Sequence, residues 1–293
     1  MQVNTGSTEA GVLVVAKREN MTSHDVVASV RRIVGQRQVG HAGTLDPDAT
    51  GVLILGLGKA TRALRLFNLL PKVYTCTFVL GIETDTLDAS GQITATYDMT
   101  LVSDEQIQDA ILTLIGDIDQ YPPMVSAVKI NGKKLYEYYR ENIEIERPLR
   151  RVSVYSFEVL NRVENELDVK ISCSSGTYIR SLAESLGQKL GGGAHIKNLI
   201  RTQIGQFNIE KAVDLDDIVL DDIISIKEAL SFLPLIEVSG DLEYRVFNGS
   251  PLTKIELEAA GPGPFVVTGG GNNFLAVYEA VSLDKLKPSM VLK

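Results

Sequence analysis

The chain has 293 residues, of which 44% are hydrophobic and 23% are charged, as in an ordinary globular protein. No apolar run approaches the roughly 20 residues of a membrane span, and residues 1–10 lack the basic start and apolar core of a secretion signal. The two cysteines, Cys76 and Cys173, lie far apart and outside any metal-binding spacing. We therefore expect a cytosolic protein with two buried, reduced thiols and no membrane association.

The net charge of -8 argues at first sight against a nucleic-acid partner, but the basic residues are clustered. Residues 1–75 contain nine Lys/Arg and five Asp/Glu, a balance of +4. The nine acidic residues from Glu83 to Asp119 follow with no basic residue among them, and we expect this stretch to face solvent or to brace a functional loop. Local cation clusters suit an RNA backbone, although they are equally typical of a solvated surface.

Hydrophobic periodicity in the first 35 residues predicts a strand followed by a helix. The apolar run Gly11–Lys17 is typical of a buried strand. Thr22 and Asp25 have the spacing of a capping box, and apolar residues then recur at helical spacing. Gly35 is a suitable residue to end this helix.

The central part of the chain continues to mix strands and helices. Residues Lys72–Leu80 and Leu167–Cys173 alternate apolar and polar side chains, which predicts two half-buried strands. Ser103 and Gln106 form a second box-like helix start, and Thr177–Leu190 has helical periodicity. Because strands and helices interleave without regular βαβ repetition, we predict an α+β fold with a mixed sheet flanked by helices.

The sequence changes character near Leu233. Short β-like runs punctuated by glycine follow, as in a small all-β domain. We therefore predict two domains, a large one in residues 1–232 and a small all-β one in residues 233–293.

Several familiar motifs can be rejected. Gly56–Thr61 lacks the spacing of a phosphate-binding loop, and Cys173–Gly176 lacks the flanking glycines of a nucleophile elbow. The three histidines, His24, His41 and His195, do not have the spacing of metal ligands. We expect no metal site.

The segment Gly40–Gly51 is the strongest candidate for chemistry. It places two carboxylates, Asp46 and Asp48, in a loop with glycine at both ends. Pro47 biases Asp46 toward an extended backbone that could aim its side chain out of the loop. The same residues would also make an ordinary turn or helix cap, and Asp48 suits that role. Spacing alone leaves both interpretations open.

With these residues the chain resembles the bacterial tRNA pseudouridine synthase B family. Residues 40–62 (GHAGTLDPDATGVLILGLGKATR) match the signature of that family almost throughout. The closing stretch resembles the PUA-like RNA-binding domain of the family. The other matching blocks follow in the order of the family: Lys72–Tyr74, Gly81–Gly91, Pro122–Tyr138, Gly176–Arg180 and Gly193–Arg201. The resemblance covers nearly the whole chain.

The resemblance implies a pseudouridine synthase catalytic domain in residues 1–232 that holds RNA in a cleft across its sheet. Such an enzyme isomerises uridine 55 in the T loop of tRNA without a cofactor. It breaks the N-glycosidic bond, rotates the uracil and rejoins it through C5. The implied partner is the T stem-loop of tRNA, with no membrane and no obligatory protein partner.

The resemblance also assigns catalytic residues. Asp46 takes the place of the obligatory aspartate, which either captures the ribose or abstracts a ribose proton. Arg180 would pair with Asp46 and keep its carboxylate oriented. Tyr74 would stack on the flipped base, and its hydroxyl could help to remove the C5 proton.

Further residues are implied to bind the substrate. Leu199 corresponds to an apolar wall of the uracil pocket, and Gly43 lies in the catalytic loop. Lys17 and His41 fit residues near the flipped nucleotide. The expected contacts to the RNA backbone come from the small domain and from Lys129, Lys133, Lys134 and Arg140.

Two departures from the family pattern stand out. The family usually has Lys-Pro-x-Gly after the first strand, where this chain has Lys17-Arg18-Glu19-Asn20. The turn must therefore form without proline and glycine. Val125 stands where an aromatic residue is usual, so any stacking at that position is lost.

Three alternatives remain at this level. The protein could act chiefly as a tRNA-folding chaperone with incidental catalysis. In that case Asp46→Asn would leave its effect on tRNA folding intact. It could also be a guide-dependent pseudouridine synthase that acts on another RNA. A carboxylate glycosidase would need a second catalytic acid at a defined distance, for which the loop offers only Asp48.

Overall fold

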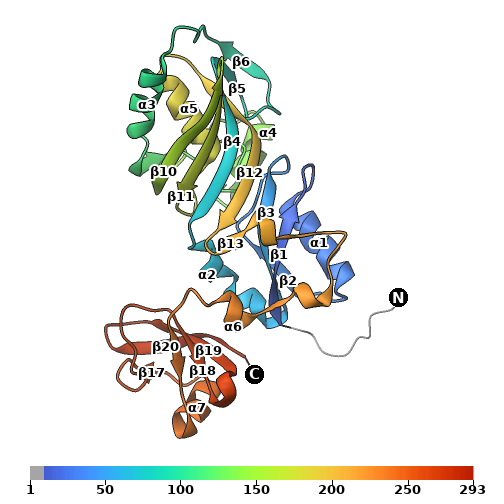
Figure 1. The fold of residues 1–293 in the computed structure, drawn as a ribbon, viewed down its shortest axis with the longest axis vertical. Helices are drawn as coiled ribbons and strands as arrows, with labels where there is room; N and C mark the ends of the chain where they lie inside the picture. The colour runs from blue at the N-terminus through green and yellow to red at the C-terminus, as the bar shows by residue number, and fades with distance from the viewer. Residues whose placement is uncertain (1–9, 293) are drawn as a thin grey trace.

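The computed structural model describes residues 10–292, and its main feature is one long, twisted, mixed sheet (Figure 1). Its central path runs in the order β14-β1-β3-β12-β4-β11-β10-β7. Neighbours are antiparallel except for the parallel pairs β1 with β14 and β3 with β12. The strands of this sheet are β1 (Gly11–Lys17), β2 (Val39–Ala42), β3 (Thr50–Leu57), β4 (Lys72–Leu80), β7 (Gly116–Gln120), β10 (Arg150–Val163), β11 (Glu166–Cys173), β12 (Ala194–Ile204), β13 (Phe207–Asn208), β14 (Val213–Asp214) and β15 (Ile224–Ser225).

Helices pack on the sheet at several places. Strand β1 is buried on both faces, because Leu13 and Val15 pack in the core beside the first helix while Val12 and Val14 pack on the opposite side. Helices α3 (Asp104–Leu112) and α5 (Ile179–Lys189) cover β4 and β11. The others are α1 (Ser23–Ile33), α2 (Leu64–Asn68) and α6 (Ile226–Ala229), with short 3-10 turns η1 (Gly58–Ala63), η2 (Ile209–Lys211) and η3 (Leu220–Asp222).

Both predicted capping boxes are present. The Asp25 amide donates to the Thr22 hydroxyl at 3.1 Å, and the Thr22 amide donates to the Asp25 carboxylate at 2.9 Å. Ser103 and Gln106 make the same reciprocal pair at the start of α3. These caps satisfy amides that a helix start otherwise leaves without partners.

A second, smaller sheet follows at one end of the molecule (Figure 1). Its strands are β16 (Leu235–Glu237), β17 (Leu252–Thr253), β18 (Phe265–Thr268), β19 (Phe274–Ala280) and β20 (Lys285–Val291), and it also carries α7 (Gly240–Phe247) and η4 (Gly270–Asn272). The order is β16-β18-β19-β20-β17, with a core of its own. Val266 and Val277 pack against the α6 side of the main sheet. The predicted fold class is confirmed, while α7 is an addition that the sequence did not indicate.

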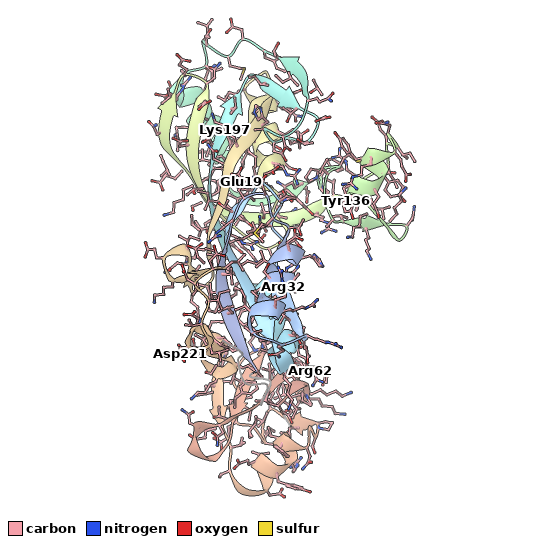
Figure 2. All side chains as sticks on the ribbon, turned by 90° about the vertical axis from the view of Figure 1, so that its right-hand side faces the viewer. Glu19, Arg32, Arg62, Tyr136, Lys197 and Asp221 are labelled. Atoms are coloured by element: carbon pink, nitrogen blue, oxygen red, sulfur yellow. The ribbon has the colours of Figure 1, made fainter. Side chains whose placement is uncertain are left out.

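Residues 121–149 form a projection that we call the lobe. It contains β8 (Lys129–Ile130), β9 (Lys133–Lys134) and α4 (Leu135–Arg140). Figure 2 shows the lobe, marked by Tyr136, standing out from the side of the main sheet. A second hairpin, β5 (Ile82–Thr84) with β6 (Ile93–Thr96), lies at the top of Figure 1.

Residues 10–292 allow three expectations to be checked, on the cysteines, the acidic stretch and membrane-spanning helices. Both cysteines are buried and free, as predicted. The acidic stretch behaves as predicted, because its members from Asp98 onward are exposed and Asp88 contacts a buried arginine near the candidate loop. No helix in this part of the chain has the length and hydropathy that crossing a bilayer requires.

The turn after β1 shows how the chain replaces proline and glycine. Asn20 has φ 60°, in the left-handed region that glycine normally fills and that asparagine tolerates best among other residues. Arg18 stands in the proline position, and its guanidinium pairs with Asp216 at 2.6 Å. The turn therefore forms, and Lys17 keeps its place at the end of the strand.

Candidate active site

The loop that contains Asp46 forms part of the wall of a cavity of about 460 Å³. The cavity lies between this loop, strands β4 and β12, the start of α5 and the base of the lobe. Residues from five separate sequence blocks meet here. Those predicted from the sequence to serve the reaction are Gly43, Asp46, Tyr74, Arg180 and Leu199, and all of them line this one cavity.

Buried side chains hold the loop through its backbone. The guanidinium of Arg201 donates to the Gly43 carbonyl at 2.9 Å. The Ser23 hydroxyl accepts from the Leu45 amide at 3.0 Å and donates to the Leu45 carbonyl at 3.3 Å. Gly43 itself has φ 73°, which favours glycine at this bend.

Lys17 provides a third anchor. Its ammonium donates to the carbonyls of Arg18, Met21 and Pro47 at 2.9, 2.6 and 2.9 Å. Burial lowers the pKa of Lys17 to about 8, against the opposing effect of the two loop carboxylates. Every second residue from Gly43 to Pro47 is thus fixed, and the Asp46 side chain between the anchors remains free to face the cavity.

Arg180 is the charged partner of Asp46. Its Nη2 lies 2.8 Å from Oδ2 of Asp46, and its Nη1 lies 3.4 Å from Oδ2 of Asp88. The guanidinium also donates to the Thr86 carbonyl at 2.9 Å and to the Val125 carbonyl at 2.8 Å. The Arg180 side chain is 4% exposed and that of Asp46 45%, so a rigid cation holds a carboxylate that substrate can reach.

The start of α5 positions Arg180. The buried Gln120 of β7 accepts from the Tyr178 amide at 2.8 Å and donates to the Tyr178 carbonyl at 3.0 Å. This paired contact takes the place of a side-chain cap at the first turn of the helix. Gly176, with φ 84°, makes the bend that precedes it.

Leu199 reaches the cavity because β12 is irregular. The pairing with β4 shifts register between Lys197 and Ile200, and Asn198 has φ 57°. Such a bulge redirects a side chain that regular pleating would point elsewhere. Leu199 also lines a second cavity of about 270 Å³, which Asp46 and Arg180 line as well.

Tyr74 lies on β4 directly opposite Arg201 of β12. Burial raises the pKa of the Tyr74 phenol, while the nearby Arg201 guanidinium opposes that rise. Tyr74 thus offers the cavity an aromatic ring together with a hydroxyl beside a cation.

Two predicted substrate contacts are placed differently. The contact of Lys17 with substrate stays a prediction, while in this structure its side chain is 1% exposed and its ammonium donates to three backbone carbonyls. Among the described residues, neither Lys17 nor His41 lines the two cavities beside Asp46. His41 instead packs edge-on against His24, with ring centroids 5.4 Å apart. Its contact with a nucleotide stays a prediction.

The lobe carries the predicted RNA-backbone residues. Lys129 lines the large cavity at the lobe base. Lys133 lies over the ring of Tyr138 at 4.7 Å and pairs with Glu141. Lys134 of the same hairpin lies over a second tyrosine ring at 5.3 Å.

Four residues of the site were not predicted to act there. Asp88 belongs to a block that resembles the family, but nothing in its spacing indicates a contact with Arg180. Lys72 and Arg201 line the large cavity although both are buried. Asp48, interpreted as a cap, accepts no hydrogen bond from residues 10–292 and lines the second cavity instead. Only the pairing of β4 with β12 would have revealed the positions of Lys72 and Arg201.

Comparisons with known proteins agree with this geometry. Residues 31–179 match the sequence model of the TruB family pseudouridylate synthase N-terminal domain, and residues 180–230 match that of the tRNA pseudouridylate synthase B C-terminal domain. A tRNA pseudouridine synthase B of Geobacillus thermodenitrificans is 42% identical over 284 residues, which cover 92% of this chain and 94% of that protein. Another, of Dehalococcoides mccartyi, is 39% identical over 289 residues, which cover 96% of each.

Among solved structures, a Cbf5-Nop10-Gar1 complex is similar with a TM-score of 0.74 and 27% identity, covering 97% of this chain and 84% of that one. These matches identify a pseudouridine synthase, which is an isomerase. The chain belongs to the TruB family of pseudouridylate synthases.

Proposed function

We propose that this enzyme converts uridine 55 in the T loop of tRNA to pseudouridine, in the cytoplasm and without a cofactor or an obligatory protein partner. The observation that carries the proposal is the ion pair of 2.8 Å between Arg180 and Asp46 at the wall of a cavity that Tyr74 and Leu199 also line. The relatives named above, tRNA pseudouridine synthases B, support tRNA as the substrate.

The cavity residues suit the steps of this reaction. The bond between ribose C1′ and uracil N1 breaks, the ring turns, and C5 forms the new bond to C1′. Asp46 serves either route by which a carboxylate opens the bond, capture of the sugar or removal of a ribose proton. Tyr74 and Leu199 would hold the two sides of the ring, and the Tyr74 hydroxyl would help to take the C5 proton, while N1 gains one.

The T-loop uridine is packed inside folded tRNA, so the enzyme must flip it out at a cost of a few kcal/mol. Phosphate contacts would hold the RNA meanwhile. Lys129, Lys133, Lys134 and Arg140 of the lobe are proposed for this. Figure 2 shows Arg32 and Arg62 on the lobe side of the molecule, between the lobe and the small domain, and both are exposed.

The domain assignment follows from the same proposal. Residues 1–232 would perform catalysis, and residues 233–293 would form a PUA-like RNA-binding domain. The separate core of the second sheet supports this division.

The test is a release assay with unmodified tRNA transcript carrying tritium at uridine C5. Wild-type protein should release tritium to water, and Asp46→Asn should not. A transcript with cytidine at position 55 is the matched control and should release no label above background. Tight tRNA binding by wild type without release would favour the tRNA-folding chaperone, and release by Asp46→Asn would mean that another group opens the bond.

A further inference from the structure

The charge around the large cavity is unbalanced. Its wall contains one carboxylate, Asp46, against a larger set of cationic side chains. These cations are Lys72, Lys129, Arg150, Arg180 and Arg201. Arg180 is neutralised by its two carboxylate partners, and Lys129 and Arg150 are exposed to solvent. The remaining two, Lys72 and Arg201, which we call the unpaired cations, are 4% and 1% exposed.

Lys72 has donor capacity to spare. Its ammonium donates to the carbonyls of Asn68 and Leu70 at 2.6 and 2.7 Å. Within residues 10–292 its third hydrogen has no acceptor, and no carboxylate lies within ion-pair distance. Burial, and next the neighbouring Arg201 charge, lower the pKa of Lys72 to about 8.

Arg201 is likewise a buried cation at the cavity wall. Its Nε donates to the Val52 carbonyl and its Nη2 to the Gly43 carbonyl, each at 2.9 Å. Its guanidinium also lies beside the Tyr74 hydroxyl, and within residues 10–292 it has no carboxylate partner. A buried charge without a counter-ion costs several kcal/mol, so two together at a cavity wall mark a place prepared for negative charge.

Strand pairing brings the unpaired cations to Tyr74. Lys72 and Tyr74 are two residues apart on β4 and so share a face of the sheet. Arg201 lies opposite Tyr74 on the neighbouring strand. The residue proposed to stack on the base is therefore flanked by both cations.

The proposed reaction generates an anion at this place. When the C1′–N1 bond opens, its electron pair leaves with the uracil, and the negative charge spreads over N1, O2 and O4. The same pair, delocalised to C5, then forms the new bond to C1′. We propose that Lys72 and Arg201 stabilise the uracil anion while it is detached and turning. This inference rests on the proposed function and assigns the groups that stabilise its leaving base.

Fixed cations aimed at developing charge stabilise a transition state strongly because they need no reorganisation. A carbonyl oxygen occupies the same side of the ring before and after the turn, because rotation about the N3–C6 axis exchanges O2 with O4. The unpaired cations could thus serve both bond breaking and bond making.

A change of leaving group tests the proposal. Fluorine at C5 withdraws electrons and stabilises the uracil anion, so a 5-fluorouridine at the target needs less help from the protein. We would measure single-turnover conversion of the target nucleoside at saturating tRNA, with uridine or 5-fluorouridine at that position. Lys72→Met should slow the uridine substrate by about 100-fold, the usual cost of one such donor, and the fluorinated substrate by about tenfold or less.

Two variants serve as controls. Lys72→Arg keeps the charge and should recover most of the rate on uridine. Lys189→Met, the same substitution at an exposed position of α5, should not change either rate. Arg201→Lys extends the test to the second cation, although Arg201 also holds two backbone carbonyls.

Equal slowing of both substrates by Lys72→Met would overturn the proposal, because a structural role does not depend on the leaving group. Weaker tRNA binding with an unchanged single-turnover rate would also overturn it and would assign the unpaired cations to an RNA phosphate. Absence of pseudouridine with wild-type protein would instead contradict the proposed function.

Discussion

The loop from Gly43 to Pro47 and the lobe face the same cavity but are built in opposite ways. The loop is held through buried Arg201, Ser23 and Lys17. In the lobe only one residue of α4 is buried, and exposed or half-exposed cations rest on tyrosine rings. Bond breaking requires a carboxylate fixed to within a fraction of an ångström, whereas holding a flexible RNA backbone requires charge that can adjust.

Arg180 connects the two regions, and its loss should have the largest effect. Arg180→Met removes the partner of Asp46 and the donor to the Val125 carbonyl at the lobe base. We expect single-turnover pseudouridine formation to fall by about 10³-fold. The free energy of unfolding should fall by roughly 1–3 kcal/mol, because the Thr86 and Val125 carbonyls lose a charged donor. Arg180→Lys should recover part of both. Activity within tenfold of wild type for Arg180→Met would show that the loop alone orients Asp46.

The second-largest effect is expected for Lys17→Met, which should change only the position of the loop. Three carbonyls lose their donor, so the Pro47 end of the loop can move. A shift of about 1 Å at the reacting group costs on the order of 100-fold in rate. We expect that loss in kcat with an unchanged tRNA Kd, measured by filter binding. A loss of affinity with normal kcat would place Lys17 at the RNA after all.

The pH dependence of the single-turnover rate distinguishes Lys72 at the cavity wall from the loop and the lobe. Because the pKa of Lys72 is lowered to about 8, its ammonium is present below that pH and is lost above it. Of the groups facing it, Arg201 contributes to the lowering of its pKa, burial raises the pKa of Cys173 to about 11, and burial also raises that of Tyr74. The single-turnover rate at saturating tRNA should therefore fall above about pH 8.

Comparison of variants identifies the group responsible for that fall. It should shrink most in Lys72→Met, which is slow at every pH, because a neutral Lys17 amine still has two hydrogens for its carbonyls. It should persist in Lys17→Met, although Lys17 has a similarly lowered pKa. A fall that persists in Lys72→Met and disappears in Lys17→Met would assign the pH dependence to the loop.

The lobe should respond through binding alone. Lys133→Ala combined with Lys134→Ala removes two candidate phosphate contacts and leaves the loop untouched. We expect tRNA affinity to weaken by about tenfold and the slope of log Kd against log salt to decrease by about 1 to 2, with single-turnover rate at saturation unchanged. Arg151→Ala, on an exposed strand position, is the control. A rate loss at saturating tRNA would mean that the lobe also orders the active site.

The smallest effect is expected in the turn after β1. Asn20 adopts φ 60° where the family pattern has glycine. Asn20→Gly should change thermal stability and activity little, within about 0.5 kcal/mol, while Asn20→Val should destabilise the protein by roughly 1–2 kcal/mol. Equal melting temperatures for the two variants would show that this turn does not depend on the left-handed conformation.

Local patterns predicted much of the fold. The capping boxes at Thr22 and Ser103 and the alternation in β4 and β11 depend on neighbouring residues, so they were legible in the sequence. The small helix α7 was not, because the glycines around it suggested short strands alone. Asp46 became a firm candidate only through the resemblance, since Asp-Pro also makes ordinary turns.

The remaining part of the site depends on register. Lys72, Arg201 and Leu199 reach the cavity through the shifted pairing of β4 with β12, and no periodicity specifies where a bulge falls. Asp88 meets Arg180 across 92 residues of sequence, a contact that only the folded chain reveals. Long-range pairing is what sequence patterns leave undetermined.

The central claim is that Asp46 performs the chemistry while other groups hold the RNA. The most direct measurement is a pair of values for Asp46→Asn, the tRNA Kd and the single-turnover conversion of the target uridine. Conversion should fall by roughly 10⁴-fold or more with Kd within about threefold of wild type, as expected for loss of a reacting group rather than of a binding contact. Conversion that persists, or that falls only in proportion to lost binding, would contradict the account.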